Sequence, residues 1–341
     1  MGRLVVVSFR LGGVDGVSIE ANKWIDALRL LGHDVTTLAG EGDADVIIQG
    51  FAIGATTAPS HNDVQTALHG ADLVIVENLV SLPLNVAARD VLYQALEGRR
   101  ALFRHHDLAS QRAQFHDADA PRDEKLWRHV TINDLSRQEL ARHGIHAIMM
   151  RNSFDCDPPL GRRDDTRRAL GIENERLVVM PTRAIRRKNV EGAIALTTTL
   201  EATLWLLGPA EDGYAPILET LINDAGVPIL RGLPEGFNVH DAYAASDLVT
   251  MPSTWEGFGN PVLESVTHRR PLAVYPYPVL EEIRSFGFHF FALDDTVALR
   301  AFLENPDEGL FVHNLELARQ HFNVATLGSR LAALLASMNV K

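Results

Sequence analysis

The sequence predicts an α/β protein of two consecutive doubly wound domains, each built on a parallel sheet. The chain has 341 residues, which suits about two domains of ~150 residues each. It opens with a strand, a glycine loop, a helix and a second strand, the order typical of a parallel sheet. After a linker rich in Asn, Asp and Pro, the same order begins again.

Short apolar strands alternate with helices through the first half of the chain. Residues 4–8 predict a buried strand, and the apolar spacing over residues 17–31 predicts a helix that ends at Gly32. Later strands are predicted at the next apolar runs, residues 33–38, 45–48, 73–76, 101–104 and 129–132.

The second half repeats this alternation after an aperiodic linker at residues 149–163. Its strands are predicted at residues 177–181, 203–208, 229–230, 248–251 and 272–275, and its helices from about residue 189 and at 217–225, 240–245 and 261–269. We therefore predict a first domain over residues 1–151 and a second over 152–312. Residues 313–341 predict a helical tail that could pack back on the first domain.

Composition and charge exclude several classes of protein. Apolar residues make up 46% and charged residues 22%, which excludes disorder, collagen and coiled coil as the main architecture. A net charge of −12 argues against nucleic-acid binding by bulk electrostatics. Cys156 is the only cysteine, so the chain forms no internal disulfide and no Cys-based zinc site. The apolar runs at 4–7 and 73–76 are too short for a signal peptide or a membrane span, so we expect a cytoplasmic protein.

A glycine loop follows the first strand and opens the first helix. Gly13 and Gly16 lie in this loop, where a ligand can approach the backbone closely and a helix N-terminus can meet an anion. Leu11 stands where a dinucleotide fingerprint needs glycine, which disfavours a nicotinamide or flavin dehydrogenase. A plain turn between strand and helix remains an alternative.

Four cations lie within six residues after the strand at 177–181, between Arg183 and Lys188. They precede a helix that Asn189 can cap. Cations at a strand end beside a helix N-terminus suit a diphosphate, and a solvated run of charge is the alternative.

Two adjacent histidines, His105 and His106, end a strand of the first domain. Neighbouring strand residues point to opposite faces, so at most one can face a bound substrate directly. The alternative for either is a histidine with its hydrogen bonds satisfied in the core or at the surface.

The most informative segment is EGFGNPVLE, residues 256–264. Asn260 and Pro261 predict the N-cap and first residue of a helix. Glu256 then lies in the loop and Glu264 in the helix, where the two carboxylates could reach different parts of one ligand. The alternative for Glu264 is a carboxylate that complements the helix dipole, worth ~0.3–1 kcal/mol. The sequence shows no clustered metal-ligand spacing, so we expect no metal site.

These motifs together resemble the retaining glycosyltransferases of family 4. EGFGNPVLE is similar to that family's E-x7-E element, and Arg183 with Lys188 resembles its R-x4-K pair. Weaker similarities follow in the same order along the chain, in GGVDGV with GHDV, HHD, NSFD, the LG of residues 207–208 and the SD and PS of residues 246–253. The resemblance implies a GT-B fold, with two Rossmann-like domains facing a central cleft. It also implies a nucleotide sugar bound mainly to the second domain, an acceptor mainly on the first, a retained anomeric configuration and no required metal or other cofactor.

The resemblance also implies roles for individual residues. Glu264 would hold the ribose hydroxyls, Glu256 would lie beside the donor sugar, and Arg183 and Lys188 would clamp the diphosphate. His106 would contact the sugar near the reacting carbon. The remaining donor-site residues implied are Gly13, Gly16, Gly257, Phe258, Gly259 and Asn260. Departures from the family pattern occur at Asn152-Ser153, often Asn-Gly, and over residues 271–279, near the donor-sugar pocket.

We therefore expect a glycosyltransferase that moves a hexosyl group from a nucleotide diphosphate sugar to a small soluble acceptor. Alternatives are another GT-B reaction, such as epimerisation or phosphorolysis, and a non-catalytic protein that binds sugar nucleotides. The segments GVSIE, HHDL and NSFDCDP are similar to those of enzymes acting on glycerate-type glycosides.

The acceptor is not expected to be a lipid or a nucleic acid. Residues 1–155 hold 15 Lys and Arg against 20 Asp and Glu, a net of −5, whereas docking on an anionic membrane needs a basic surface. Arg99, Arg100 and Arg104 are expected to face the cleft, where they could suit an anionic acceptor. The oligomeric state stays open.

Overall fold

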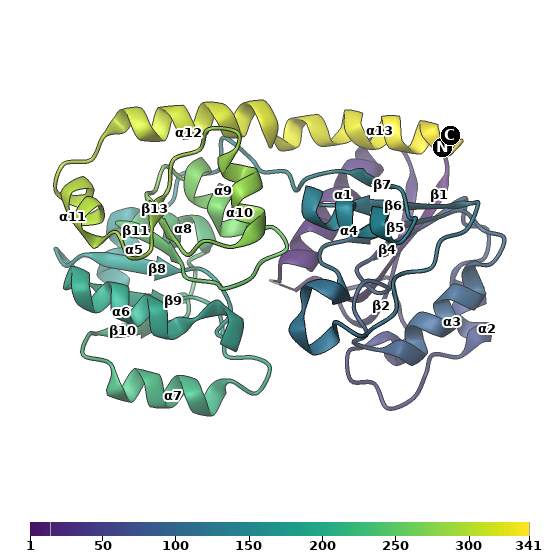
Figure 1. Ribbon diagram of the computed structural model, residues 1–341, viewed down its shortest axis with the longest axis horizontal. Coiled ribbons are helices and arrows are strands. Elements are labelled where there is room, and N and C mark those ends of the chain that lie inside the picture. The colour runs from purple at the N-terminus through teal and green to yellow at the C-terminus, as the bar shows by residue number, and fades with distance from the viewer. Residues whose placement is uncertain (14, 341) are drawn as a thin grey trace. The chain divides into compact units, whose positions relative to one another are not determined.

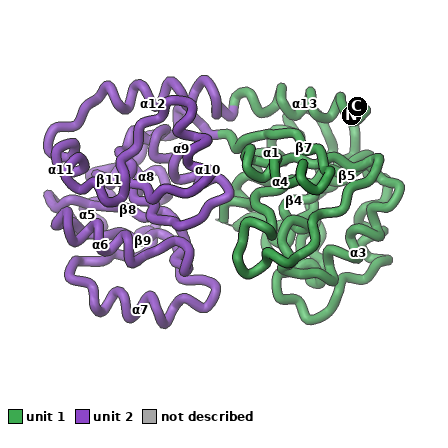
Figure 2. The backbone as a smooth tube through the Cα atoms, in the orientation of Figure 1, with its two compact units in different colours: residues 1–153, 325–341 green, residues 154–324 purple. Residues whose placement is uncertain are grey.

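The computed structural model describes residues 1–13 and 15–340 and divides the chain into two compact units (Figure 2). Unit 1 is Met1–Ser153 with Ala325–Lys341, and unit 2 is Phe154–Val324. Each unit is a parallel sheet with helices on both faces, as the alternation of strands and helices predicts (Figure 1). The boundary between the units lies two residues after the predicted one, and the predicted tail is shared between the units.

Unit 1 contains a sheet in the order β3-β2-β1-β4-β5-β6-β7, with parallel pairing throughout. Its strands are β1 (Arg3–Leu11), β2 (Asp34–Gly42), β3 (Val46–Ile47), β4 (Leu73–Glu77), β5 (Ala101–His105), β6 (Trp127–Thr131) and β7 (Ala147–Met149). β4 is buried along its whole length, and its first four residues form a continuous apolar run, as is typical of a strand covered on both faces. The strand predicted at 45–48 is shorter, since a 3₁₀ turn begins at residue 49.

Helices cover both faces of this sheet. α2 and α3 pack on one face, over the cluster that contains Val5, Val74 and Phe103. α1 and α13 contact each other on the other face. The helical elements are α1 (Gly16–Leu30), α2 (His61–Ala67), α3 (Val86–Leu96), α4 (Asp134–Arg142) and α13 (Leu327–Ser337), with the 3₁₀ turns η1 (Gln49–Phe51), η2 (Ala109–Gln111) and η3 (Ala113–Phe115).

Unit 2 contains a second parallel sheet, in the order β10-β9-β8-β11-β12-β13. Its strands are β8 (Leu177–Met180), β9 (Thr203–Leu206), β10 (Ile229–Arg231), β11 (Leu248–Met251), β12 (Leu272–Val274) and β13 (Phe291–Ala292). β8, β9, β11 and β12 are buried throughout, because helices pack on both faces of the sheet.

The helices of unit 2 divide between the two faces (Figure 1). α6, α7 and α11 share a core with β8 and β9, while α9 packs on β11 and β12 and against α12. The helical elements are α5 (Arg163–Ala169), η4 (Arg186–Lys188), α6 (Val190–Leu200), α7 (Ala215–Asp224), α8 (Val239–Ala245), α9 (Asn260–Thr267), α10 (Pro278–Arg284), α11 (Thr296–Glu304) and α12 (Glu308–His321), and η5 (Val324–Thr326) follows at the boundary.

The predicted tail at 313–341 falls on two helices with different packing. α12 contacts α9 in unit 2, whereas α13 contacts α1 in unit 1. The buried leucines of α13, at positions 327, 331, 334 and 335, lie at helical spacing along one face. Across residues 1–13 and 15–340, no helix has the length and apolar character needed to cross a membrane.

Both sheets reverse their strand order at one point, between β1 and β4 in unit 1 and between β8 and β11 in unit 2. Successive connections on either side of such a point run over opposite faces of the sheet, which leaves a crevice at the carboxyl ends of the two strands. Ligands of doubly wound sheets bind in this crevice. The loops that follow these four strands are therefore where a site is expected.

Candidate active site

The two most informative motifs of the sequence meet at the reversal point of unit 2. The cationic run follows β8, the EGFG segment follows β11, and the two strands pair through Val178 with Leu248. Hydrogen bonds join the two loops directly. Asn189 caps α6 as predicted and donates from Nδ2 to the carbonyl of Pro252 at 3.2 Å, while Thr254 N–H donates to the Arg187 carbonyl at 2.9 Å.

Glu256 lies between two cations of the other loop. Arg187 donates to its Oε2 at 2.9 Å and to the Trp255 carbonyl at 3.0 Å, and Lys188 Nζ contacts its Oε1. Both Glu256 and Lys188 are buried. Sequence reasoning placed Arg187 in the cationic run without assigning it to the site. Its partner is 69 positions away.

Burial and ion pairing shift the pKa values of Glu256 and Lys188 in opposite directions. Burial alone would raise the pKa of Glu256, but Arg187 and Lys188 outweigh it and hold the pKa at about 2. Burial lowers the pKa of Lys188 to about 8, although Glu256 acts to raise it. The carboxylate is therefore charged at neutral pH, and the ammonium titrates not far above it.

Arg183 occupies the start of the same loop and pairs with another carboxylate. Its Nη1 lies 2.5 Å from Oε2 of Glu211, and both side chains are partly exposed. Gly208, after β9, permits this arrangement, because a Cβ there would lie 2.6 Å from the Arg183 Cα. The Leu-Gly motif therefore makes room for the backbone of the cationic loop.

The start of α9 differs from the prediction. Gly259 is the N-cap, with φ of +90°, so Asn260 is the first helical residue and Pro261 the second. Asn260 is therefore not the N-cap. A Cβ on Gly259 would lie 2.3 Å from the Tyr277 hydroxyl oxygen, which donates to the Phe258 carbonyl at 2.8 Å. The close approach of Tyr277, together with the positive φ, explains why glycine stands here.

The other predicted residues of this loop have different surroundings. The Phe258 ring is buried, stacked on Phe154 at 5.9 Å and edge-on to Phe322. A donor could thus meet Phe258 through its backbone rather than its ring. Gly257 and Asn260 are partly exposed.

Glu264 is half-buried and held by a tyrosine from α8. The Tyr243 hydroxyl donates to Glu264 Oε2 at 2.7 Å, and the Tyr243 ring stacks on His268 at 4.4 Å. Burial raises the pKa of Tyr243 well above its usual range and lowers that of His268 to about 4, so both are neutral near pH 7. No sequence pattern links Tyr243 to Glu264. Packing of α8 against α9 brings them together.

In unit 1 the two histidines at the end of β5 point to opposite faces, as predicted. His105 is fully buried, with Nδ1 2.7 Å from Ser81 Oγ and Nε2 2.9 Å from His129 Nδ1. Burial, with its histidine neighbours, lowers the pKa of His105 well below the usual range. His105 therefore has both ring nitrogens engaged inside the unit. His106 has Nε2 2.7 Å from Oε2 of Glu77.

His106 lies at one end of a series of paired polar and charged side chains. Glu77 also pairs with Arg104 at 3.3 Å, Arg104 pairs with Glu20 at 3.2 Å, and Lys23 pairs with Glu20 at 2.5 Å. Burial would raise the pKa of Glu77, but Arg104 and His106 lower it, so the carboxylate stays charged. Glu77 was missed from the sequence because it is 29 positions from His106.

The expectation that Arg99, Arg100 and Arg104 face a cleft and suit an anionic acceptor is wrong. Arg104 is fully buried between Glu20 and Glu77 and packs over Trp24 at 4.3 Å. Arg99 and Arg100 precede β5, at the edge of the sheet opposite to His106. Arg99 donates to the Leu68 carbonyl at 3.1 Å. Alternation along the strand turned Arg104 inward, toward the α1 face.

The glycine loop after β1 is organised by a carboxylate. Asp15 is the N-cap of α1 and accepts hydrogen bonds from the N–H groups of Val17 and Ser18, while Arg10 lies 3.0 Å from it. Gly13 lies two positions before this cap, and Gly16 is the first residue of α1. Close approach of a diphosphate to Gly13 and Gly16 stays a prediction. Val14 of the same motif lies outside the described residues.

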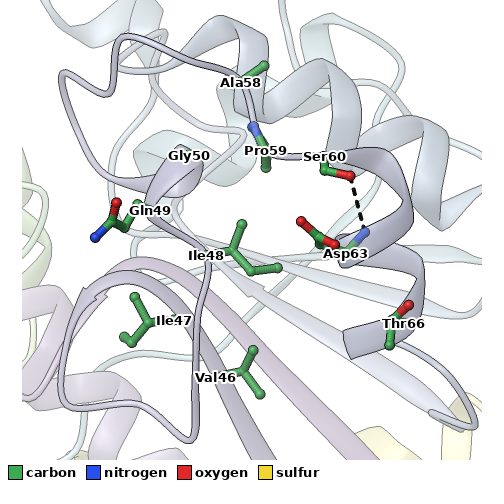
Figure 3. A pocket seen from close by; sticks show the side chains of 10 residues that line it. All are labelled: Val46, Ile47, Ile48, Gln49, Gly50, Ala58, Pro59, Ser60, Asp63 and Thr66. Atoms are coloured by element: carbon green, nitrogen blue, oxygen red, sulfur yellow. Dashed lines mark hydrogen bonds between the residues drawn. The ribbon is translucent and has the colours of Figure 1, made fainter.

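A hollow of about 710 Å³ lies elsewhere in unit 1, beside the edge strand β3 (Figure 3). Its lining comes from β3, η1, α2 and the segment before α2, and includes Ile48, Gln49, Pro59 and Asp63. The predicted site residues do not line this hollow. Within residues 1–13 and 15–340, no group of three or more His, Cys, Asp or Glu side chains is arranged to hold a metal ion.

Part of the chain is similar to a known protein family, and most of it is similar to two curated relatives. The family model of glycosyl transferases group 1 matches residues 162–295, which include Arg183, Lys188, Glu256 and Glu264. A mannosylglucosylglycerate synthase from Thermotoga maritima is 25% identical, covering 95% of this chain and 97% of the relative. Another from Petrotoga mobilis is 25% identical, covering 84% of this chain and 86% of the relative.

Solved structures share the fold over nearly the whole chain. HepE from Anabaena, in complex with UDP-glucose, superposes with a TM-score of 0.75 at 18% identity, covering 98% of this chain and 99% of that one. Sucrose-phosphate synthase from Thermosynechococcus elongatus gives a TM-score of 0.75 at 16% identity, covering 99% of each chain.

Replacing Gly259 by alanine should lower stability more than the same change at Gly236. Both glycines have positive φ, but an added Cβ meets Tyr277 at Gly259 and has no atom within 4 Å among the described residues at Gly236. We expect a loss of about 1–2 kcal/mol for Gly236→Ala, from the left-handed backbone, and about 1–3 kcal/mol more for Gly259→Ala, from overpacking. Thermal unfolding of both variants measures the difference, and equal losses would contradict the crowding.

Proposed function

We propose a reaction for this chain, which is a family-4-like glycosyltransferase of the GT-B fold. The reaction is transfer of a hexosyl group, with retention of anomeric configuration, from a nucleoside diphosphate sugar to a small glycerate-type acceptor. One observation carries the proposal: Arg187 and Lys188 on one loop pair with Glu256 on the other, at the reversal point of the unit 2 sheet, and Arg183 lies at the start of the same cationic loop.

The cationic loop supplies what the leaving group needs. Negative charge develops on the diphosphate as its bond to the anomeric carbon breaks. Fixed cations in a buried setting stabilise that charge, with each preorganised donor worth roughly 2.7–4 kcal/mol. The proposal therefore requires no metal ion. In this scheme a phosphate oxygen takes the acceptor proton, and the acceptor attacks from the face that the diphosphate leaves.

The donor would be bound in two parts. Glu264, held by Tyr243, is proposed to accept hydrogen bonds from the ribose hydroxyls, and the cations to hold the diphosphate. Glu256 would lie beside the donor sugar. Because each carboxylate oxygen has two lone pairs, Glu256 can accept a sugar hydroxyl while it stays paired with its cations.

The acceptor class is supported by the two relatives, whose names describe a mannosyl group joined to glucosylglycerate. A glycerate carries a carboxylate, which calls for a cation. Arg10 near the end of β1 and Arg112 after β5 are only partly buried and lie toward the carboxyl edge of the unit 1 sheet. Both are better candidates than the buried Arg104, and His106 would contact the sugar near the reacting carbon.

The reaction is tested by incubating the enzyme with UDP-, GDP- and ADP-hexoses, with and without glucosylglycerate. We expect nucleoside diphosphate release that depends on the acceptor, and a product whose anomeric configuration, read by NMR, matches the donor. A binding protein would release no nucleoside diphosphate, and an epimerase would change the donor without an acceptor. Lys125→Ala, on an exposed lysine, should transfer normally, whereas Lys188→Ala should not.

Nucleoside affinity tests the assignment of Glu264. Glu264→Ala should weaken nucleoside and nucleoside diphosphate alike, while Tyr243→Phe, which removes one hydrogen bond to a charged group, should weaken both by roughly tenfold. Tyr275→Phe, on an exposed tyrosine, is the control. Calorimetry gives the affinities, and wild-type affinity for the nucleoside in Glu264→Ala would refute the ribose contact.

Replacing His106 and replacing His105 should have different effects on kcat. His106→Ala is expected to lower kcat by roughly 10²-fold, because a donor near the reacting carbon is lost. His105→Ala should mainly lower the melting temperature, because it empties a buried position. The exposed His143→Ala serves as control. A larger kcat loss at His105 than at His106 would show that the wrong histidine was chosen.

A further inference from the structure

Lys188 is an unusual cation for this chain. Only four of the 32 basic residues are lysines, at positions 23, 125, 188 and 341, and the rest are arginines. An arginine stays charged at any physiological pH, but a buried lysine can lose its proton. Of the two cations that pair with Glu256 at the reversal point, Lys188 is thus the one whose charge depends on its surroundings.

The charged groups acting on Lys188 come from three segments. Glu256, in the loop after β11, contacts the ammonium and favours its charged form. Arg187 in η4 and Arg183 after β8 are like charges and oppose it, as does burial. Tyr277, which also faces Glu256, has a pKa raised well above its usual range by burial and stays neutral. Glu256 is thus the favourable partner in an otherwise unfavourable setting.

We propose that Glu256 is a positioning residue for the diphosphate site, which keeps Lys188 in its charged form at neutral pH and holds it beside Arg187. This role is separate from contact with the donor sugar, and it rests on the proposed donor site. Without Glu256, Lys188 would be buried beside two arginines and would have no carboxylate to stabilise its charged form.

The direction of the expected change in the pKa of Lys188 follows from its pairing with the opposite charge of Glu256. With Glu256 present, Lys188 titrates at about pH 8 and is mostly charged below that. Removing an opposite charge in contact lowers such a midpoint by roughly 1–3 pH units. Glu256→Gln would then make Lys188 mostly neutral at pH 7.5. If Lys188 kept its proton, loss of the carboxylate would give the site one more net positive charge. Because Lys188 loses its proton, the site instead loses its lysine cation.

Direct titration of Lys188 is the primary test. With four lysines in the chain, NMR of selectively labelled lysine side chains can follow Lys188, assigned through Lys188→Arg. We expect a midpoint near pH 8 in the wild type, a midpoint lower by at least about one pH unit in Glu256→Gln, and one near the wild-type value in Glu256→Asp, which keeps the charge. A wild-type midpoint near the ordinary lysine value, or equal midpoints in wild type and Glu256→Gln, would overturn the proposal.

Glu211→Gln provides a matched control. It removes a carboxylate of the same charge from the same site, but its partner is Arg183 rather than a lysine. Its Lys188 midpoint should stay much closer to that of the wild type than the Glu256→Gln midpoint does. A shift as large as that of Glu256→Gln would mean that Lys188 responds to general charge, and the specific role of Glu256 would fail.

Binding of UDP gives a second readout that needs no transfer. Between pH 7 and 9.5, where a terminal phosphate is already ionised, the wild type should lose UDP affinity as pH rises through about 8. Glu256→Gln should bind roughly tenfold more weakly at pH 7.5, and Lys188→Arg should show no such loss with pH. If no form of the protein binds UDP or GDP, the proposed donor site fails, while the NMR midpoints still decide the role of Glu256.

Discussion

The reversal of strand order between β8 and β11 is the constraint on which the candidate site depends. These strands are neighbours in the sheet although the chain makes a long excursion through β9, β10 and their helices between them. The chain leaves β8 toward α6 on one face of the sheet and leaves β11 toward α9 on the other face. The two loops therefore diverge from neighbouring strand ends and leave a crevice between them at the carboxyl edge. The cationic loop and the EGFG loop face each other because of this topology. Hydrogen bonds from Asn189 and Thr254 then hold the two loops in register.

Both units place charges in their interior, and the physical requirement is the same in each. A charge removed from water must be paired, since its desolvation is otherwise too costly. In unit 2 this requirement pairs Glu256 with Arg187 and Lys188, at the edge where a ligand would bind. In unit 1 it produces the chain from His106 through Glu77 and Arg104 to Glu20. Arg104 and Glu20 are buried within the unit, whereas His106 lies at one end of this series of contacts, directly after the last residue of β5.

The residues that resemble family motifs divide into two kinds. Gly208 and Gly259 are required by packing, because a Cβ on either would collide with a neighbouring segment. Phe258 is likewise a core residue, stacked against Phe154. Lys188, Glu256 and Glu264 have polar atoms held by specific partners near the edge of the sheet. A motif such as EGFG therefore combines residues that shape the loop with a charged residue held by partners from another loop.

The sequence by itself determined the fold class, the alternation of strands and helices, the order of the motifs, the cap at Asn189 and the opposite directions of His105 and His106. These features depend on local periodicity and on residue types a few positions apart, which one strand or helix can display. Only the tertiary structure decided which side chains meet. It paired Tyr243 with Glu264, Glu77 with His106 and Arg187 with Glu256, buried Arg104, and made Gly259 rather than Asn260 the cap of α9. The physical reason is that these outcomes depend on how separate elements pack and on where a buried charge finds its partner, and neither is encoded in the spacing of residues along a single element.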